Sequence, residues 1–138
     1  MEPIAIVTAF VAALYIVGRG PLVVAPTATA AFYRRMLSNP DPGRVRIFGG
    51  LLVLLAAALI VTARQARADQ GGITILIEGF GWYTAAVAVW VIAAPRPWQQ
   101  VAYSFWDGIS DQTGLLRAIG VFNTVIGLAF GFVAFSVR

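Results

Sequence analysis

Few side chains in this sequence can do chemistry, and two of the most versatile types are missing. The 138 residues include ten basic and six acidic side chains, but no His and no Cys. Such a chain cannot build a His- or Cys-ligated zinc, haem or iron–sulfur site, a disulfide, or a Ser-His-Asp triad. We therefore expect no catalytic residue and no metal site, and we expect that the protein is not an enzyme.

The acid set most deeply in an apolar stretch is Glu78, which lies near the start of the stretch 73–94. An ionisable side chain in hydrocarbon costs free energy and marks a candidate functional site. Arg19 is the obvious partner, but at about 1.5 Å per residue it lies roughly 24 Å into its stretch and Glu78 roughly 7 Å into its own. We therefore expect them to reach opposite interfaces, with Arg19 directed to lipid phosphates. The alternative is a functional role for Glu78.

Basic and aromatic side chains flank the apolar stretches, at the depth of lipid head groups. Arg46 and Arg117 stand just inside the N-terminal ends of two stretches, where a helix dipole disfavours a cation. A lipid phosphate, the nearby Asp41 or Asp111, or a partner's carboxylate would compensate. The candidate lipid- or interface-contacting residues are Arg19, Arg34, Arg35, Arg46, Arg117, Trp98 and Trp106.

Small residues form stripes that would let helices approach closely. Gly127 and Gly131 have the small-xxx-small spacing typical of membrane helix contacts, and Asn123 could donate a hydrogen bond across such a contact. We expect these stripes to pack within the chain, and contacts with a neighbouring subunit are the alternative. The candidate packing residues are Gly49, Gly50, Gly120, Asn123, Gly127 and Gly131.

The elements that position these residues are predicted to be transmembrane helices. The chain is 59% apolar and 12% charged, whereas a soluble domain is about half apolar and about a quarter charged. A bilayer core about 30 Å thick needs about 20 helical residues. Four stretches qualify, and the first lacks the features of a cleaved signal peptide, so we expect an all-α membrane protein. The predicted spans are 3–24, 45–63, 73–94 and 115–137.

Two connections between spans have the periodicity of amphipathic helices. The segments 27–38 and 98–109 follow Pro26 and Pro97, and each places apolar and aromatic residues on one helical face. Helices of this kind lie in the membrane interface, and a surface loop is the alternative. Each connection ends in a helix-start signal, Asp41-Pro42 in the first and Asp111 or Thr113 in the second.

These parallels indicate a tandem repeat. Pro26, Gly43, Arg46 and Gly49 each match an identical residue 71 positions later. We therefore predict one membrane domain made of two parallel two-span repeats, residues 1–68 and 69–138. More arginines flank the amphipathic connections than the opposite ends, which predicts cytoplasmic connections and both termini outside a bacterial inner membrane.

The first half resembles the YjeT-like family of small bacterial inner-membrane proteins, which have two spans and no established function. The resemblance covers about 65 residues, with Val17 in place of the family's acidic residue, and the second half is a diverged copy. Members are often encoded beside prohibitin-like membrane protease regulators, so the resemblance implies a membrane-protein partner. The matching residues are Gly18-Arg19-Gly20-Pro21, Pro26, Tyr33-Arg34-Arg35-Met36, Asn39-Pro40-Asp41 and Arg46-Ile47-Phe48-Gly49-Gly50.

Three functions fit this sequence. The first is a non-catalytic accessory or structural subunit that packs against a larger membrane complex or lipid. The second is a small transporter or channel, formed after oligomerisation. The third is a pigment- or quinone-binding subunit, suggested by aromatic residues such as Trp82 and Trp90, although belt residues at the interface explain them as well. We expect bound lipid but no cofactor in the first case, a homo-oligomer as an option, and no nucleic-acid partner, because the arginines flank apolar spans.

Overall fold

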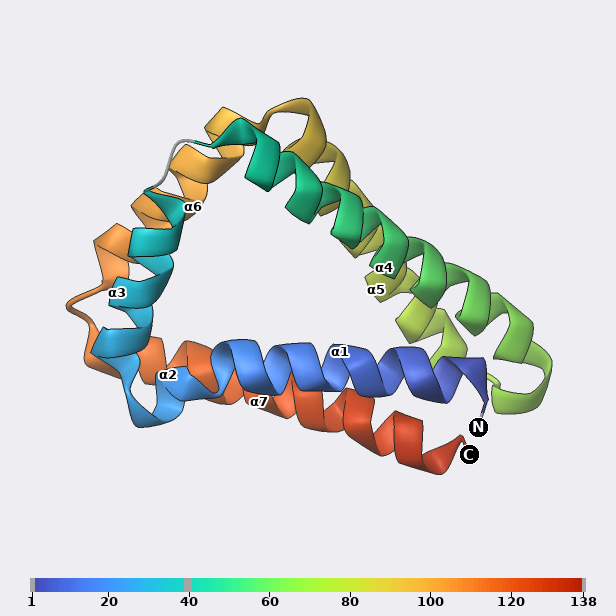
Figure 1. Ribbon diagram of the computed structural model, residues 1–138. Helices are drawn as coiled ribbons and strands as arrows, with labels where there is room; N and C mark the ends of the chain where they lie inside the picture. The colour runs from blue at the N-terminus through green and yellow to red at the C-terminus, as the bar shows by residue number, and fades with distance from the viewer. Residues whose placement is uncertain (1, 39–40, 138) are drawn as a thin grey trace. The chain divides into compact units, whose positions relative to one another are not determined.

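The structure, a computed structural model, describes residues 2–38 and 41–137, and all regular secondary structure in these residues is helical (Figure 1). Contacts divide them into two compact units. The first contains residues 2–8, 41–95 and 133–137, and the second contains residues 9–38 and 96–132. The helices are α1 Pro3–Arg19, α2 Pro21–Val24, α3 Pro26–Leu37, α4 Pro42–Gln70, α5 Ile73–Ala93, α6 Pro95–Ile109 and α7 Thr113–Ser136.

Four helical segments are long and apolar enough to cross a membrane, as the sequence predicted. They are Pro3–Val24, which joins α1 and α2, and the helices α4, α5 and α7. The largest difference from the predicted boundaries is in α4, which continues seven residues past the predicted end at residue 63. Apolar character fades there, but helical hydrogen bonding continues until Gly71, whose φ of 65° suits glycine and ends the helix.

The start signals act as the sequence indicates. The side chain of Asp41 accepts hydrogen bonds from the backbone N–H groups of Gly43 and Arg44 at 3.1 and 3.4 Å, so it caps α4, and Pro42 occupies the first turn. Helix α7 begins at Thr113. Both connections predicted to be amphipathic helices are helical, as α3 and α6.

In the first unit, α4 and α5 form an antiparallel hairpin around the turn at Gly71 and Gly72. Glycines bring the helices close together at two levels. A Cβ atom added to Gly49 would lie 2.6 Å from Cγ1 of Ile92, and one added to Gly81 would lie 2.8 Å from Cγ1 of Ile60. Neither site has room for a larger residue. The buried residues between the helices include Ala56, Leu59, Ala63, Ile77, Ala88 and Val91.

In the second unit, the part of α1 from residue 9 onward and α2 lie antiparallel to α7. A Cβ atom added to Gly120 would lie 2.8 Å from Cβ of Leu22, and one added to Gly127 would lie 2.9 Å from Cγ1 of Ile16. Helices α3 and α6 pack beside the same end of this pair. The shared core consists of Leu22, Ala30, Trp106 and Leu116, with Tyr33, Leu37, Ile109 and Ile119 packed against it.

The predicted packing residues divide into two groups. Gly49, Gly120 and Gly127 make close contacts within a unit, whereas an added Cβ at Gly131 would have only ordinary contact with Ala12 and one at Gly50 would meet nothing within 4 Å. Asn123 donates a hydrogen bond of 2.8 Å to the carbonyl oxygen of Ile119, one turn earlier in its own helix. The amide is therefore engaged along α7, where the sequence suggested a bond to another helix.

Candidate functional site

Helices α3 and α6 pack antiparallel in the second unit, and they carry most of its charged and aromatic side chains. Near the C-terminal end of α3, the carbonyl oxygen of Leu37 accepts a hydrogen bond of 2.5 Å from the side-chain amide of Gln99. One turn earlier, Tyr33 stacks on Trp106, with ring centroids 4.8 Å apart. Prolines stand in the first turns of both helices, where a missing N–H costs no hydrogen bond.

Arg19, the last residue of α1, lies over this aromatic pair. Its guanidinium carbon is 4.9 Å from the ring centroids of both Tyr33 and Trp106, a cation–π distance. The sequence suggested that Arg19 reaches lipid phosphates, but its charge faces protein rings. Trp106, a predicted lipid or interface contact, is only 6% exposed because it packs in the core of the unit.

Beside the aromatic pair, Arg34 and Asp107 form an ion pair with an N–O distance of 3.0 Å. Both side chains are more than one-third exposed, so the pair is worth at most about 1 kcal/mol. The neighbouring Arg35 is exposed, and Trp98 is half-buried. The pair therefore ties α3 to α6 and leaves Arg35 at the surface.

Arg46 and Arg117 are exposed near the starts of α4 and α7. Asp41, one of the compensating acids suggested from the sequence, instead caps α4 and pairs with Arg44 at 3.3 Å. Within the part of the chain that the structure describes, no ion pair involves Arg46 or Arg117. A lipid phosphate or a partner's carboxylate remains the predicted partner for each.

Glu78 lies between two arginines of the first unit. One of its carboxylate oxygens accepts a hydrogen bond of 2.8 Å from Nε of Arg64, and the other pairs with Arg67. The indole N–H of Trp82 is 3.5 Å from the carboxylate. The Glu78 side chain is 12% exposed, whereas both arginine side chains are at least half exposed. The acid is therefore neutralised across the α4–α5 hairpin by cations that reach its surface.

Sequence reasoning missed this cluster because it ended the second span at residue 63. Arg64 and Arg67 are spaced to share one helical face, and they stand about as far before the Gly71-Gly72 turn as Glu78 stands after it. Residues at equal distances from a tight hairpin turn face each other. That symmetry was the signal that could have revealed the pairing.

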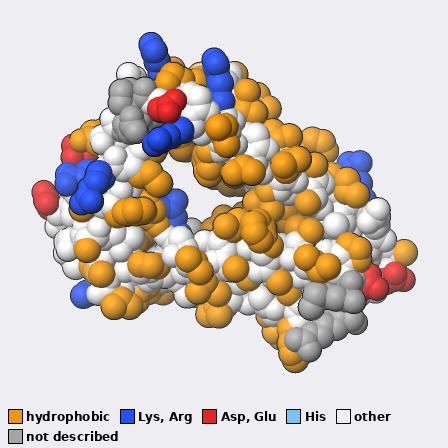
Figure 2. Space-filling view, in the orientation of Figure 1, with side chains coloured by type: hydrophobic (Ala, Val, Ile, Leu, Met, Phe, Trp, Pro, Cys, Tyr) orange, Lys and Arg blue, Asp and Glu red, His pale blue; other side chains and the backbone are white. Residues whose placement is uncertain are grey.

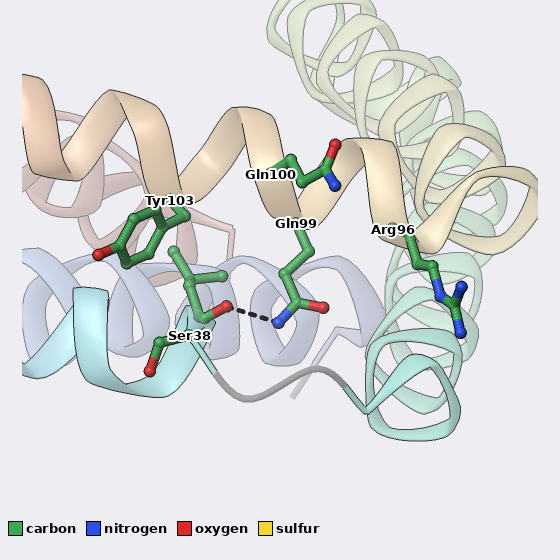
Figure 3. A pocket seen from close by; sticks show the side chains of 6 residues that line it. Ser38, Arg96, Gln99, Gln100 and Tyr103 are labelled. Atoms are coloured by element: carbon green, nitrogen blue, oxygen red, sulfur yellow. Dashed lines mark hydrogen bonds between the residues drawn. The ribbon is translucent and has the colours of Figure 1, made fainter.

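A polar pocket of about 460 Å³ lies between α3 and α6 (Figure 3). Its lining combines a cation with amide and hydroxyl groups, and the sequence had suggested none of these residues as a site. Among the described residues, no group of three or more His, Cys, Asp and Glu side chains could hold a metal ion. The pocket is lined by Leu37, Ser38, Arg96, Gln99, Gln100 and Tyr103.

The surface around these polar groups is largely apolar. Figure 2 shows hydrophobic side chains over much of the visible face of the long helices. On α3 and α6, the residues Phe32, Met36, Val101 and Phe105 are each more than half exposed. Such exposure is typical of a surface that meets lipid or another protein.

Comparison with known proteins gives no relative. No family model matches this chain, and no curated protein or solved structure matches it. The resemblance to the YjeT-like family stays a prediction from the motif residues.

Proposed function

We propose that this chain is a non-catalytic accessory subunit of the bacterial inner membrane that packs against a larger membrane complex. The observation that carries the proposal is the engagement of Glu78 with Arg64 and Arg67. An acid inside a transport path or a catalytic centre has to exchange its partners, whereas this one ties two helices of a hairpin together. Its role is then to build a stable membrane element.

Contacts in the two units also favour the proposed tandem repeat. Gly49 lies against Val91 and Ile92 of α5, and Gly120, 71 residues after Gly49, lies against Leu22 and Val23. The two contacted pairs are themselves 69 residues apart. Equivalent helices therefore make equivalent contacts, which is expected if α5 and α7 repeat α1 and α4.

In this arrangement, α3 and α6 are the interfacial helices of the two repeats. The arginine bias assigns them to the cytoplasmic side, with both termini outside. Their exposed residues Phe32, Met36, Val101 and Phe105 supply apolar contact area, and Arg35 supplies charge at head-group level. The same surface suits a lipid interface and the edge of a partner subunit. A homo-oligomer is included among such partners.

Copurification from native membranes tests the proposal. The chain, tagged and expressed near its natural level, is extracted in mild detergent, and coeluting proteins are quantified by mass spectrometry. We expect one or a few membrane proteins in near-stoichiometric amounts, absent from an equally tagged, unrelated four-span protein. A chain that always isolates alone would contradict the proposal.

Photocrosslinking adds a matched pair of positions on α7. Benzoylphenylalanine replaces Phe122, which is 67% exposed, or Leu116, which is fully buried. We expect a crosslink to the partner from position 122 and only intramolecular products from position 116. Equal capture from both positions would indicate nonspecific contact.

The two other functions considered from the sequence have no specific observation in their favour among the described residues. A transporter or channel predicts solute flux in liposomes that Glu78→Gln abolishes. A pigment- or quinone-binding subunit predicts a chromophore or quinone in the purified protein.

A further inference from the structure

We propose that the pocket between α3 and α6 binds the phosphate-bearing head group of an anionic phospholipid, with Arg96 as its cationic ligand. The pocket, of about 460 Å³, is open at the surface of the second unit. Figure 3 shows Arg96, Gln99 and Tyr103 spaced along the same stretch of α6, with Ser38 of α3 opposite. Neither the spans nor the accessory function requires this pocket to be polar.

The charges of the lining favour an anion. Arg96 is exposed, and no ion pair in the part of the chain that the structure describes involves it. The residues that line the pocket include no carboxylate. Asp107, the acid on the same helix, pairs with Arg34 at 3.0 Å. A guanidinium with this freedom can donate two parallel hydrogen bonds to phosphate oxygens.

The other polar groups of the lining divide between structure and ligand. The side-chain amide of Gln99 donates to the carbonyl oxygen of Leu37, and the hydroxyl of Ser38 donates to the carbonyl oxygen of Arg35. These two bonds fix the end of α3 against α6 and so shape the pocket. The amide of exposed Gln100 and the hydroxyl of Tyr103 are further donors available at its rim.

The place of Arg96 in the chain favours a lipid over a soluble phosphate. Helix α5, an apolar helix of 21 residues, ends at Ala93, and α6 starts at Pro95. At about 1.5 Å per residue, such a helix matches a hydrocarbon core about 30 Å thick. Arg96 therefore follows directly on the end of a span, at the level of phospholipid head groups. Leu37 and the ring of Tyr103 add apolar surface for the glycerol and acyl region.

This site needs a chain embedded in a bilayer, as the proposed function does, but it needs no protein partner. A failure to copurify a partner would leave the lipid site standing. Loss of lipid selectivity would leave a protein partner possible. The two proposals therefore fail separately.

Native mass spectrometry of the full-length chain in detergent micelles measures the binding. The chain is titrated with phosphatidylglycerol and, separately, with phosphatidylcholine of the same acyl chains. We expect tighter binding of phosphatidylglycerol and a loss of about tenfold in its affinity in Arg96→Gln, the usual effect of losing one charge-assisted hydrogen bond. Arg96→Lys keeps the charge and should retain part of the affinity.

Arg35→Gln is the matched control, because it removes an exposed arginine of α3 that does not line the pocket. It should preserve the preference for phosphatidylglycerol, and circular dichroism should show equal helix content in all variants. Equal binding of the two lipids, an unchanged affinity in Arg96→Gln, or an equal loss in Arg35→Gln would each overturn the proposal. Displacement of the lipid by an equal concentration of glycerol 3-phosphate would assign the site to soluble phosphates and also overturn it.

Discussion

The α4–α5 hairpin and the antiparallel pair formed by α1 and α7 use the same close contact with opposite placement of the glycine. Gly81 of α5 lies 3.3 Å, measured from an added Cβ, from the carbonyl oxygen of Ala56, and Gly127 of α7 lies 3.2 Å from that of Ala12. In both contacts the next neighbours are the residues three and four positions further along, and the fourth is an isoleucine. Counted through the repeat, glycine and alanine have changed places.

The two helix pairs differ completely in their charges. The hairpin holds Glu78 between Arg64 and Arg67, whereas the other pair ends in Arg19 lying over two aromatic rings. Backbone approach is therefore the shared requirement, and each unit has its own means of accommodating a charge. The following predictions are ordered from the largest expected effect to the smallest.

The strongest test of the shared contact is a large residue at its glycine. Gly81→Leu and Gly127→Leu should each destabilise the protein by about 1–3 kcal/mol, because the added side chain has to displace the facing helix. Thermal unfolding followed by helical circular dichroism measures the loss. Gly79→Leu, two residues away in α5 and with nothing within 4 Å of an added Cβ, is the control. An equal loss in Gly79→Leu would mean that close approach is not the cause.

Removing the charge of Glu78 tests the feature special to the hairpin. Glu78→Gln leaves Arg64 and Arg67 facing each other without the carboxylate, so the unfolding midpoint should fall, though less than in Gly81→Leu. A double-mutant cycle with Arg64→Gln should show coupling between the two positions. Additive effects would show that the contact contributes nothing to stability.

Arg19 tests the corresponding feature of the second unit. Arg19→Met keeps the length and removes the charge, and it should cost about 1 kcal/mol, within the range of cation–π contacts. Arg19→Lys should recover part of that loss, because an ammonium lacks the planar group that stacks on rings. An unchanged midpoint for Arg19→Met would refute the cation–π assignment.

The ion pair between Arg34 and Asp107 should have the smallest effect. Arg34→Gln should cost less than about 1 kcal/mol, and the difference from the parent protein should shrink in high salt because the pair is exposed. A larger, salt-independent loss would indicate that Arg34 packs α3 against α6 through its aliphatic part.

The sequence predicts the spans well, because the hydrophobic windows are long and uninterrupted. It also predicts the cap at Asp41 and the helical connections, because these depend on local residues. The Glu78 cluster and the Arg19 contact could not be predicted in the same way. Both depend on which helix faces which, and an apolar helix with many alternative faces does not specify its neighbour. Counting depth showed that Arg19 and Glu78 are not partners, but it did not identify their real ones.

The position of the Glu78 cluster near the hairpin turn has a consequence for biogenesis. In the proposed orientation, the turn at Gly71 is the part of the hairpin that has to be translocated across the bilayer. Between Arg64 and Glu78 the sequence holds two arginines and two acids, so this tip has no net charge. A hairpin in which Glu78 pairs early with Arg64 could enter the membrane as a single neutral unit, and its two arginines would count less toward retention in the cytoplasm than unpaired ones.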